Sequence, residues 1–173
     1  MKKQLSLKTL GMAAGLSAAA LLAASPVQAD SPLISTSRIT METALKIAQG
    51  AIDACRKEGV QIAVTVVDRA GHPQVMLRDV LAMDLTLTIS QQKAYTALSF
   101  NMPTSEVGAR FREPYSVMKI DGLVASAGGL PITAAGALLG GVGVSGAPSG
   151  ITDEKCAQAG IDAVTADLEM SAF

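Results

Sequence analysis

The sequence is poor in the side chains that most metal and nucleic-acid sites need. It has no tryptophan, one histidine, two cysteines, two tyrosines and three phenylalanines. One histidine and two distant cysteines cannot build a tetrahedral zinc site within one chain. Without an aromatic platform or a cluster of lysine and arginine, the chain does not fit nucleic-acid binding. Aliphatic side chains and methionine must therefore fill its core.

The N-terminus has the pattern of a secretory signal peptide. Three lysines accompany an apolar segment over residues 10–24, and a small-residue cleavage pattern ends at Ala29. The apolar segment is short for a membrane span. We expect a signal peptide over residues 1–29 and a periplasmic or secreted protein without a membrane segment after cleavage. An uncleaved N-terminal anchor is the alternative.

The mature chain is mildly acidic and suits one domain. Three of the 14 basic residues and none of the 15 acidic residues lie in the expected signal peptide, which leaves a net charge of about −4. This charge disfavours adhesion to anionic lipid. The remaining length predicts a flexible leader over residues 30–39 and a single domain over residues 40–173.

Hydrophobic periodicity predicts an α+β domain. Helices are expected over residues 41–57, 83–100, 103–111 and 153–170. Strands are expected over residues 61–68, 73–78, 122–126, 130–134 and 138–145. The order is α-β-β-α-α-β-β-β-α. Because strands joined by short turns run antiparallel, the prediction is a five-stranded antiparallel sheet packed with helices.

Glycines gather in the stretch 128–146, which contains the last predicted hairpin. Several glycines in strands indicate that another backbone or a ligand comes close. Residues 141–146 match G-x-G-x-x-G, but no helix follows directly, so a dinucleotide site is disfavoured. Residues 90–93 match S-x-x-K without its partner motifs, which favours polar neighbours on a helix.

Two further features leave alternatives open. Cys55 and Cys156 are expected either to form a disulfide in an oxidising compartment or to be buried free thiols. His72, in the turn after the first strand, is either a solvated polar residue or a ligand contact, including a haem-iron ligand. Tyr115 is another candidate iron ligand. Together with Phe111 and the arginines beside it, Tyr115 forms either a surface cluster or a platform for a planar ring with carboxylates.

Six stretches together resemble the GlcG/HbpS-like family of haem-binding proteins, also known as DUF336, and point to a secreted member. They are Val64–His72, Gln92–Ala97, residues 100–104, residues 128–132, residues 140–146 and Asp153–Ala163. The resemblance implies a profilin-like sheet, assembly into a homo-oligomer, and haem as the cofactor of some members. Other members accompany glycolate metabolism or cobalamin enzymes.

The resemblance implies a pocket bordered by Lys93 and the glycine-rich strands. The expected cofactor-binding residues are His72, Lys93, Phe111, Tyr115, Met118, Gly128, Gly129 and Pro131, with His72 or Tyr115 as the haem-iron ligand. The first hypothesis is therefore a periplasmic or secreted haem-binding protein in haem sequestration, sensing or degradation.

Two rival hypotheses follow from the same residues. One is an accessory protein or enzyme acting on a small carboxylate, with Lys93 as the anion-binding or proton-transfer group. The other is an interaction module whose sheet packs against other subunits. The residues leave open whether the protein is an enzyme.

Overall fold

The computed structural model describes residues 32–113 and 116–171, which contain four α-helices and four β-strands. The elements in chain order are α1 (Met41–Lys57), β1 (Ala63–Asp68), β2 (Pro73–Arg78), α2 (Leu85–Phe100), α3 (Thr104–Arg110), the short 3-10 helix η1 (Val117–Lys119), β3 (Gly129–Ala134), β4 (Ala137–Ser145) and α4 (Gly150–Ser171). None of these helices is long and apolar enough to cross a membrane.

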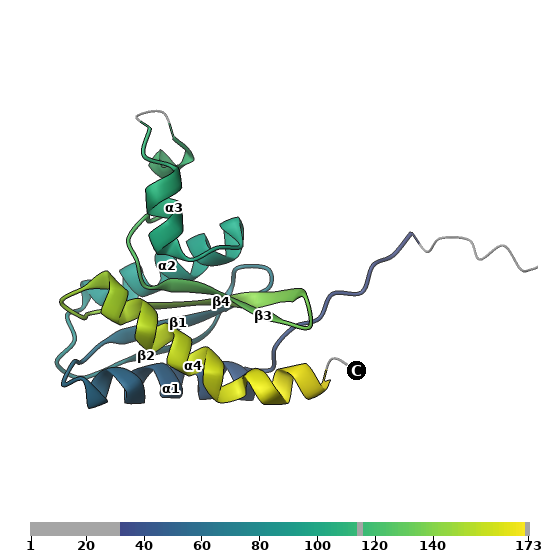
Figure 1. Cartoon of the computed structure of the whole chain (residues 1–173), viewed down its shortest axis with the longest axis horizontal. Coiled ribbons are helices and arrows are strands. Elements are labelled where there is room, and N and C mark those ends of the chain that lie inside the picture. The colour runs from purple at the N-terminus through teal and green to yellow at the C-terminus, as the bar shows by residue number, and fades with distance from the viewer. Residues whose placement is uncertain (1–31, 114–115, 172–173) are drawn as a thin grey trace, which may run out of the picture. The chain divides into compact units, whose positions relative to one another are not determined.

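The strands form one antiparallel sheet in the order β2-β1-β4-β3. Helices α1 and α4 lie side by side on one face of the sheet, and α2 lies on the other face (Figure 1). The main apolar core fills the space between the sheet and the pair α1 and α4. The α+β class and the antiparallel sheet are therefore confirmed.

The predicted five strands are wrong, because residues 122–126 do not join the sheet. The backbone N–H of Leu123 donates to the Ile120 carbonyl at 3.3 Å within a turn. The N–H of Val124 donates to the Thr96 hydroxyl of α2 at 3.0 Å. These groups are paired by a turn and a helix side chain, so the segment needs no neighbouring strand. The observed order is α-β-β-α-α-β-β-α.

Local sequence signals explain the ends of α1. The Thr40 hydroxyl accepts a hydrogen bond from the Thr43 N–H at 3.2 Å and so caps the first turn. The predicted bounds of this helix are confirmed, as are those of β2. Helix α4 instead begins at Gly150, three residues before the prediction, because Thr152 and Asp153 already donate to the Ser149 carbonyl.

Helix α2 packs against β4 at the glycines of that strand. A Cβ atom at Gly141 would collide with the Ala94 carbonyl oxygen, and one at Gly143 with the Ser90 carbonyl oxygen. Backbone of α2 therefore occupies the space that these missing side chains leave. Of the two neighbours that the glycines predicted, a backbone or a ligand, the structure has a backbone on this side.

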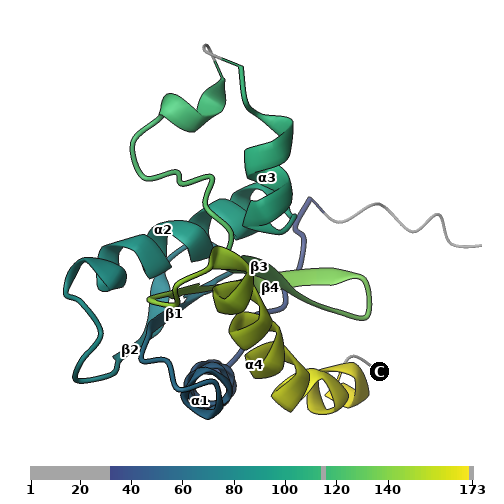
Figure 2. The same cartoon turned by 60° about the vertical axis from the view of Figure 1, so that its left-hand side comes forward.

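Helix α3 projects away from the sheet on the side of α2 (Figure 2). An aromatic pair holds its C-terminal end, since the rings of Phe100 and Phe111 lie 5.0 Å apart between centroids. The Arg110 guanidinium lies 5.8 Å from the Phe111 ring centroid.

Candidate functional site

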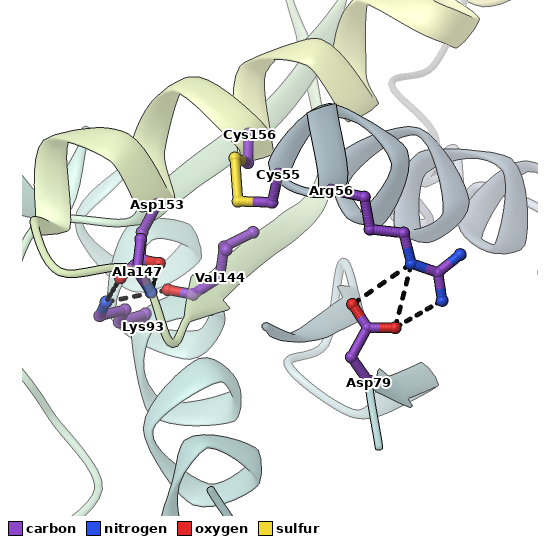
Figure 3. The surroundings of a disulfide bond; sticks show 8 residues. All are labelled: Cys55, Arg56, Asp79, Lys93, Val144, Ala147, Asp153 and Cys156. Carbon is purple, nitrogen blue, oxygen red and sulfur yellow. Dashed lines mark hydrogen bonds and ion pairs between the residues drawn. A yellow bond between two sulfur atoms is a disulfide. The ribbon is translucent and has the colours of Figure 1, made fainter. Parts of the chain in front are cut away.

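Lys93 is a residue of α2, and its side chain extends toward β4 (Figure 3). The residue is almost completely buried. Its Nζ donates to the Val144 carbonyl at 2.8 Å and to Asp153 Oδ2 at 2.9 Å. The second carboxylate oxygen of Asp153 accepts from the Ala147 N–H at 2.9 Å. Lys93 thus connects α2 to the end of β4 and, through Asp153, to the loop before α4.

Burial raises the pKa of the Asp153 carboxyl above its ordinary value, although Lys93 and the backbone donors act in the opposite direction. The adjacent Glu154 makes a second set of contacts. It accepts from the Ser105 hydroxyl at 2.9 Å and from the Gly128 N–H at 3.3 Å. The first turn of α4 therefore joins the middle of α2, the start of α3 and the residue before β3.

The glycines named as pocket residues lie in this buried cluster. A Cβ atom at Gly128 would lie 2.6 Å from the Lys93 Nζ. The Gly129 N–H donates to the Thr104 hydroxyl at 2.9 Å. Pro131 follows in β3, paired in register with Gly141. Lys93, Gly128 and Gly129 are thus brought together, and their described contacts are with other parts of this chain.

The remaining predicted residues lie elsewhere. Phe111 follows α3, and Met118 lies half-buried in η1. Tyr115 lies outside the described residues. His72 occupies the turn between β1 and β2, with 81% of its side chain exposed.

Tyr95 lies beside this turn, on the exposed side of α2. A Cβ atom at Gly71, which has φ +86°, would lie 2.8 Å from Tyr95 Cε2, so the tyrosine ring rests directly against the residue before His72. The residue Tyr95 is 42% exposed. The fold therefore places the Tyr95 ring beside the turn that carries the only histidine of the chain.

Two surface hollows meet at Tyr95. The first, the glutamine hollow, has a volume of about 270 Å³ and is lined by Gly71, Thr88, Gln91, Gln92, Tyr95 and Gly122. The second, the Arg69 hollow, has a volume of about 460 Å³ and is lined by Arg69, Ala70, Tyr95, Leu98, Ser99, Asn101 and Leu138. Along α2, the glutamine hollow lies on the N-terminal side of Tyr95 and the Arg69 hollow on its C-terminal side.

Asp68 holds the shape of the turn that carries His72. Its Oδ1 accepts from the Ala70 and His72 N–H groups, both at 2.9 Å. Burial raises the pKa of this carboxyl, but the two backbone donors and nearby cationic groups outweigh it and hold the pKa below its ordinary value. The carboxylate therefore stays ionised and keeps the turn fixed.

Tyr95 and Arg69 are site residues that sequence reasoning missed. One signal was present, because Thr88, Gln91 and Tyr95 recur at helical spacing and so share one polar face of α2. A lone large aromatic on such a face is a candidate for ligand contact. Its neighbour Gly71 is distant in sequence, and no local pattern links the two.

Within the described part of the chain, no group of three or more histidine, cysteine, aspartate or glutamate side chains is placed to hold a metal ion. On the opposite face of the sheet, Cys55 of α1 and Cys156 of α4 form a disulfide with Cα atoms 5.5 Å apart (Figure 3). Both cysteines are buried, and the bond joins the two helices that cover the main core.

Comparison with known proteins identifies relatives over most of the chain. Residues 39–162 match the family model described as haem degrading protein HbpS-like. An uncharacterised 15.0 kDa protein from the dhaT–dhaS intergenic region of Citrobacter freundii is 32% identical over 113 residues, which cover 62% of this chain and 80% of that protein.

Solved structures with the same fold include one of HbpS and one of a haem complex. A double mutant of HbpS from Streptomyces reticuli is 42% identical, with a TM-score of 0.73 over 81% of this chain and 97% of that one. A complex of PduOC with haem is 25% identical, with a TM-score of 0.67 over 73% of this chain and 94% of that one.

Proposed function

The chain belongs to the HbpS-like family of haem-degrading proteins, and from that premise we propose that it binds haem at Tyr95 and His72. The observation that carries the proposal is the contact between the Tyr95 ring and Gly71, which sets the phenol beside the turn of the single histidine. Phenolate and imidazole are both ligands of haem iron in proteins. The haem complex of PduOC, a relative of the same fold, supports the same cofactor class.

The residues around Tyr95 and the turn of His72 fit haem in three respects. Because Gly71 has no side chain, the Tyr95 ring packs directly against its backbone, so the phenol is held in place before any ligand arrives. His72 and Tyr95 are exposed, so neither donor must leave a buried partner to bind iron. The two hollows beside Tyr95 offer apolar and polar lining for the periphery of a large planar ligand.

Bound haem supplies redox-active iron, which is the chemistry that haem sensing and degradation need. The chain contributes the donor atoms of Tyr95 and His72 and the amide groups of Gln91 and Gln92. Asp68 keeps the turn of His72 in one conformation. Whether the protein degrades haem is tested separately, by following loss of the haem spectrum in the presence of a reductant and oxygen.

Titration of the purified protein with hemin tests the proposal. We expect a shift of the Soret band in the wild-type protein and a weaker or altered spectrum for Tyr95→Phe and for His72→Ala. Tyr115→Phe is the matched control, because it makes the same phenol-to-phenyl change at the other tyrosine of the chain. An unaltered spectrum in both Tyr95→Phe and His72→Ala would remove these residues as ligands. A change in Tyr115→Phe alone would move the site to the segment after α3.

The contacts of Lys93 do not favour the alternative of a carboxylate-binding site at this residue. Its Nζ already pairs with Asp153 and with the Val144 carbonyl, and the residue is 2% exposed. An incoming carboxylate would have to displace a buried ion pair, which is costly. We therefore assign Lys93 a structural role and place the ligand on the exposed side of α2.

We further propose that the protein acts in the periplasm or outside the cell as a homo-oligomer. The signal-peptide pattern and the Cys55–Cys156 disulfide support the location. The loop between β2 and α2 supports association, because Val80, Leu81 and Met83 are exposed there. Cell fractionation and sedimentation at low concentration test the two proposals. A cytoplasmic or strictly monomeric protein would contradict them.

A further inference from the structure

We propose that the Arg69 hollow is a carboxylate subsite, which binds the anionic edge of the haem whose iron is held by Tyr95 or by His72. The inference rests on the proposed function and adds to it that the protein recognises the carboxylates at the edge of the haem ring. It predicts that the protein selects planar ligands with free carboxylates over neutral esters of the same ring.

The residues with polar side chains that line this hollow are Arg69, Tyr95, Ser99 and Asn101, and none of them carries a carboxylate. Arg69 brings a guanidinium, Asn101 an amide and Ser99 a hydroxyl, and no aspartate or glutamate lines the hollow. A guanidinium beside neutral donors is a typical arrangement for binding a carboxylate.

The guanidinium of Arg69 is free to bind a ligand. In the ranges that the structure describes, no hydrogen bond or ion pair joins Arg69 to another residue, and its side chain is exposed. The neighbouring Asp68 is engaged elsewhere, since its Oδ1 accepts from two backbone N–H groups and its Oδ2 lies 3.7 Å from Arg38.

In other arginine-lined hollows of the described chain, the guanidinium groups already have partners. Arg38 lines one of them, and its guanidinium lies 3.7 Å from Asp68. Arg56 and Arg78 line a hollow together with Asp53 and Asp79. Arg56 pairs with Asp79 through two nitrogen atoms, and Arg78 donates to three backbone carbonyls. These guanidinium groups are neutralised or occupied within the chain, so the Arg69 hollow is the better anion site.

The floor of the Arg69 hollow is apolar. Leu98 packs with Val67 and Ala94 in a small buried cluster, and Leu138 packs against it. Leu98 and Leu138 also line the hollow. A ligand that fits must therefore carry an apolar body and a carboxylate together, which is the chemistry of a tetrapyrrole with carboxylate side chains. A small hydrophilic acid would leave the apolar floor without a partner.

The test compares hemin with its dimethyl ester, which has the same ring and iron but no free carboxylate. Binding of each is measured by Soret titration to the wild-type protein, to Arg69→Gln and to Arg112→Gln. We expect the wild type to bind hemin about tenfold more tightly than the ester, as for the loss of one charge-assisted hydrogen bond. Arg69→Gln should weaken hemin about tenfold and leave the ester unchanged, while Arg112→Gln should change neither.

Each other outcome has a distinct meaning. Equal affinity of the wild type for hemin and ester, or discrimination that persists in Arg69→Gln, overturns the subsite but leaves haem binding intact. Loss of discrimination in Arg112→Gln alone moves the subsite to the segment after α3. No binding of either compound overturns the proposed function and the subsite together. Because Arg69 has no described partner, its variant should unfold at the wild-type denaturant concentration, which excludes misfolding as the cause.

Discussion

Replacing Lys93 by methionine separates a structural role for this residue from a role in ligand binding. The side chains of Lys93 and Asp153 are 3% and 4% exposed, and their charged atoms lie 2.9 Å apart. Removing one partner of such a buried pair costs about 3–5 kcal/mol, because the remaining charge is left without compensation. We expect the free energy of unfolding of Lys93→Met to fall by about this amount at neutral pH.

The loss should also depend on pH. Burial already raises the pKa of the Asp153 carboxyl, and without Lys93 it should rise further. A carboxyl whose folded pKa exceeds its unfolded value destabilises the fold as pH rises through the folded pKa. The cost of Lys93→Met should therefore shrink on acidification. Adding Asp153→Asn should recover part of the stability by removing the unpaired charge.

Urea unfolding followed by circular dichroism measures these differences. Lys46→Met is the matched control, because Lys46 pairs with Asp167 at 3.5 Å on the surface, where the two side chains are 62% and 63% exposed. That change should cost at most about 1 kcal/mol. A similarly small cost for Lys93→Met, together with lost hemin binding, would refute the structural role.

Three further perturbations have defined outcomes. Reducing the disulfide, whose sequence separation is 101, should lower the free energy of unfolding by up to about 4.7 kcal/mol in urea titrations with and without reductant. Gly71→Ala should displace the Tyr95 ring in NMR spectra and weaken hemin binding, whereas Gly136→Ala, at a similar φ of +77° but in open space, should not. Despite burial, hydrogen bonds hold the pKa of the Asp68 carboxyl below its ordinary value. The stabilisation from this carboxylate should therefore be lost as pH falls through its folded pKa, and acid unfolding of Asp68→Asn should show less of this loss.

Local signals in the sequence were sufficient to predict α1 and β2. The capping Thr40 and the spacing of small apolar residues define α1, and β2 begins at Pro73. The predicted strand over residues 122–126 failed because an apolar, extended segment does not reveal what its backbone groups bind. In the structure the Val124 N–H donates to the Thr96 hydroxyl and not to the carbonyl of a neighbouring strand.

The candidate site depends on contacts that are distant in sequence. The glycines of β4 predicted a close neighbour, but only the fold identifies it as the backbone of α2. The partner of Lys93, Asp153, lies 60 positions later in the chain, so the sequence does not reveal that the ammonium group is paired. Tyr95 became a candidate because it rests against Gly71, a residue of a different element. Such pairings follow from packing, which one sequence does not reveal.

The most direct test of haem binding at Tyr95 or His72 is a crystal structure of the protein with hemin, in which anomalous scattering locates the iron. We expect the iron to be bonded to Tyr95 Oη or to the His72 imidazole, with a carboxylate of the ring at Arg69. Iron bonded instead to Tyr115 or Met118 would contradict the assignment of the site to the exposed side of α2.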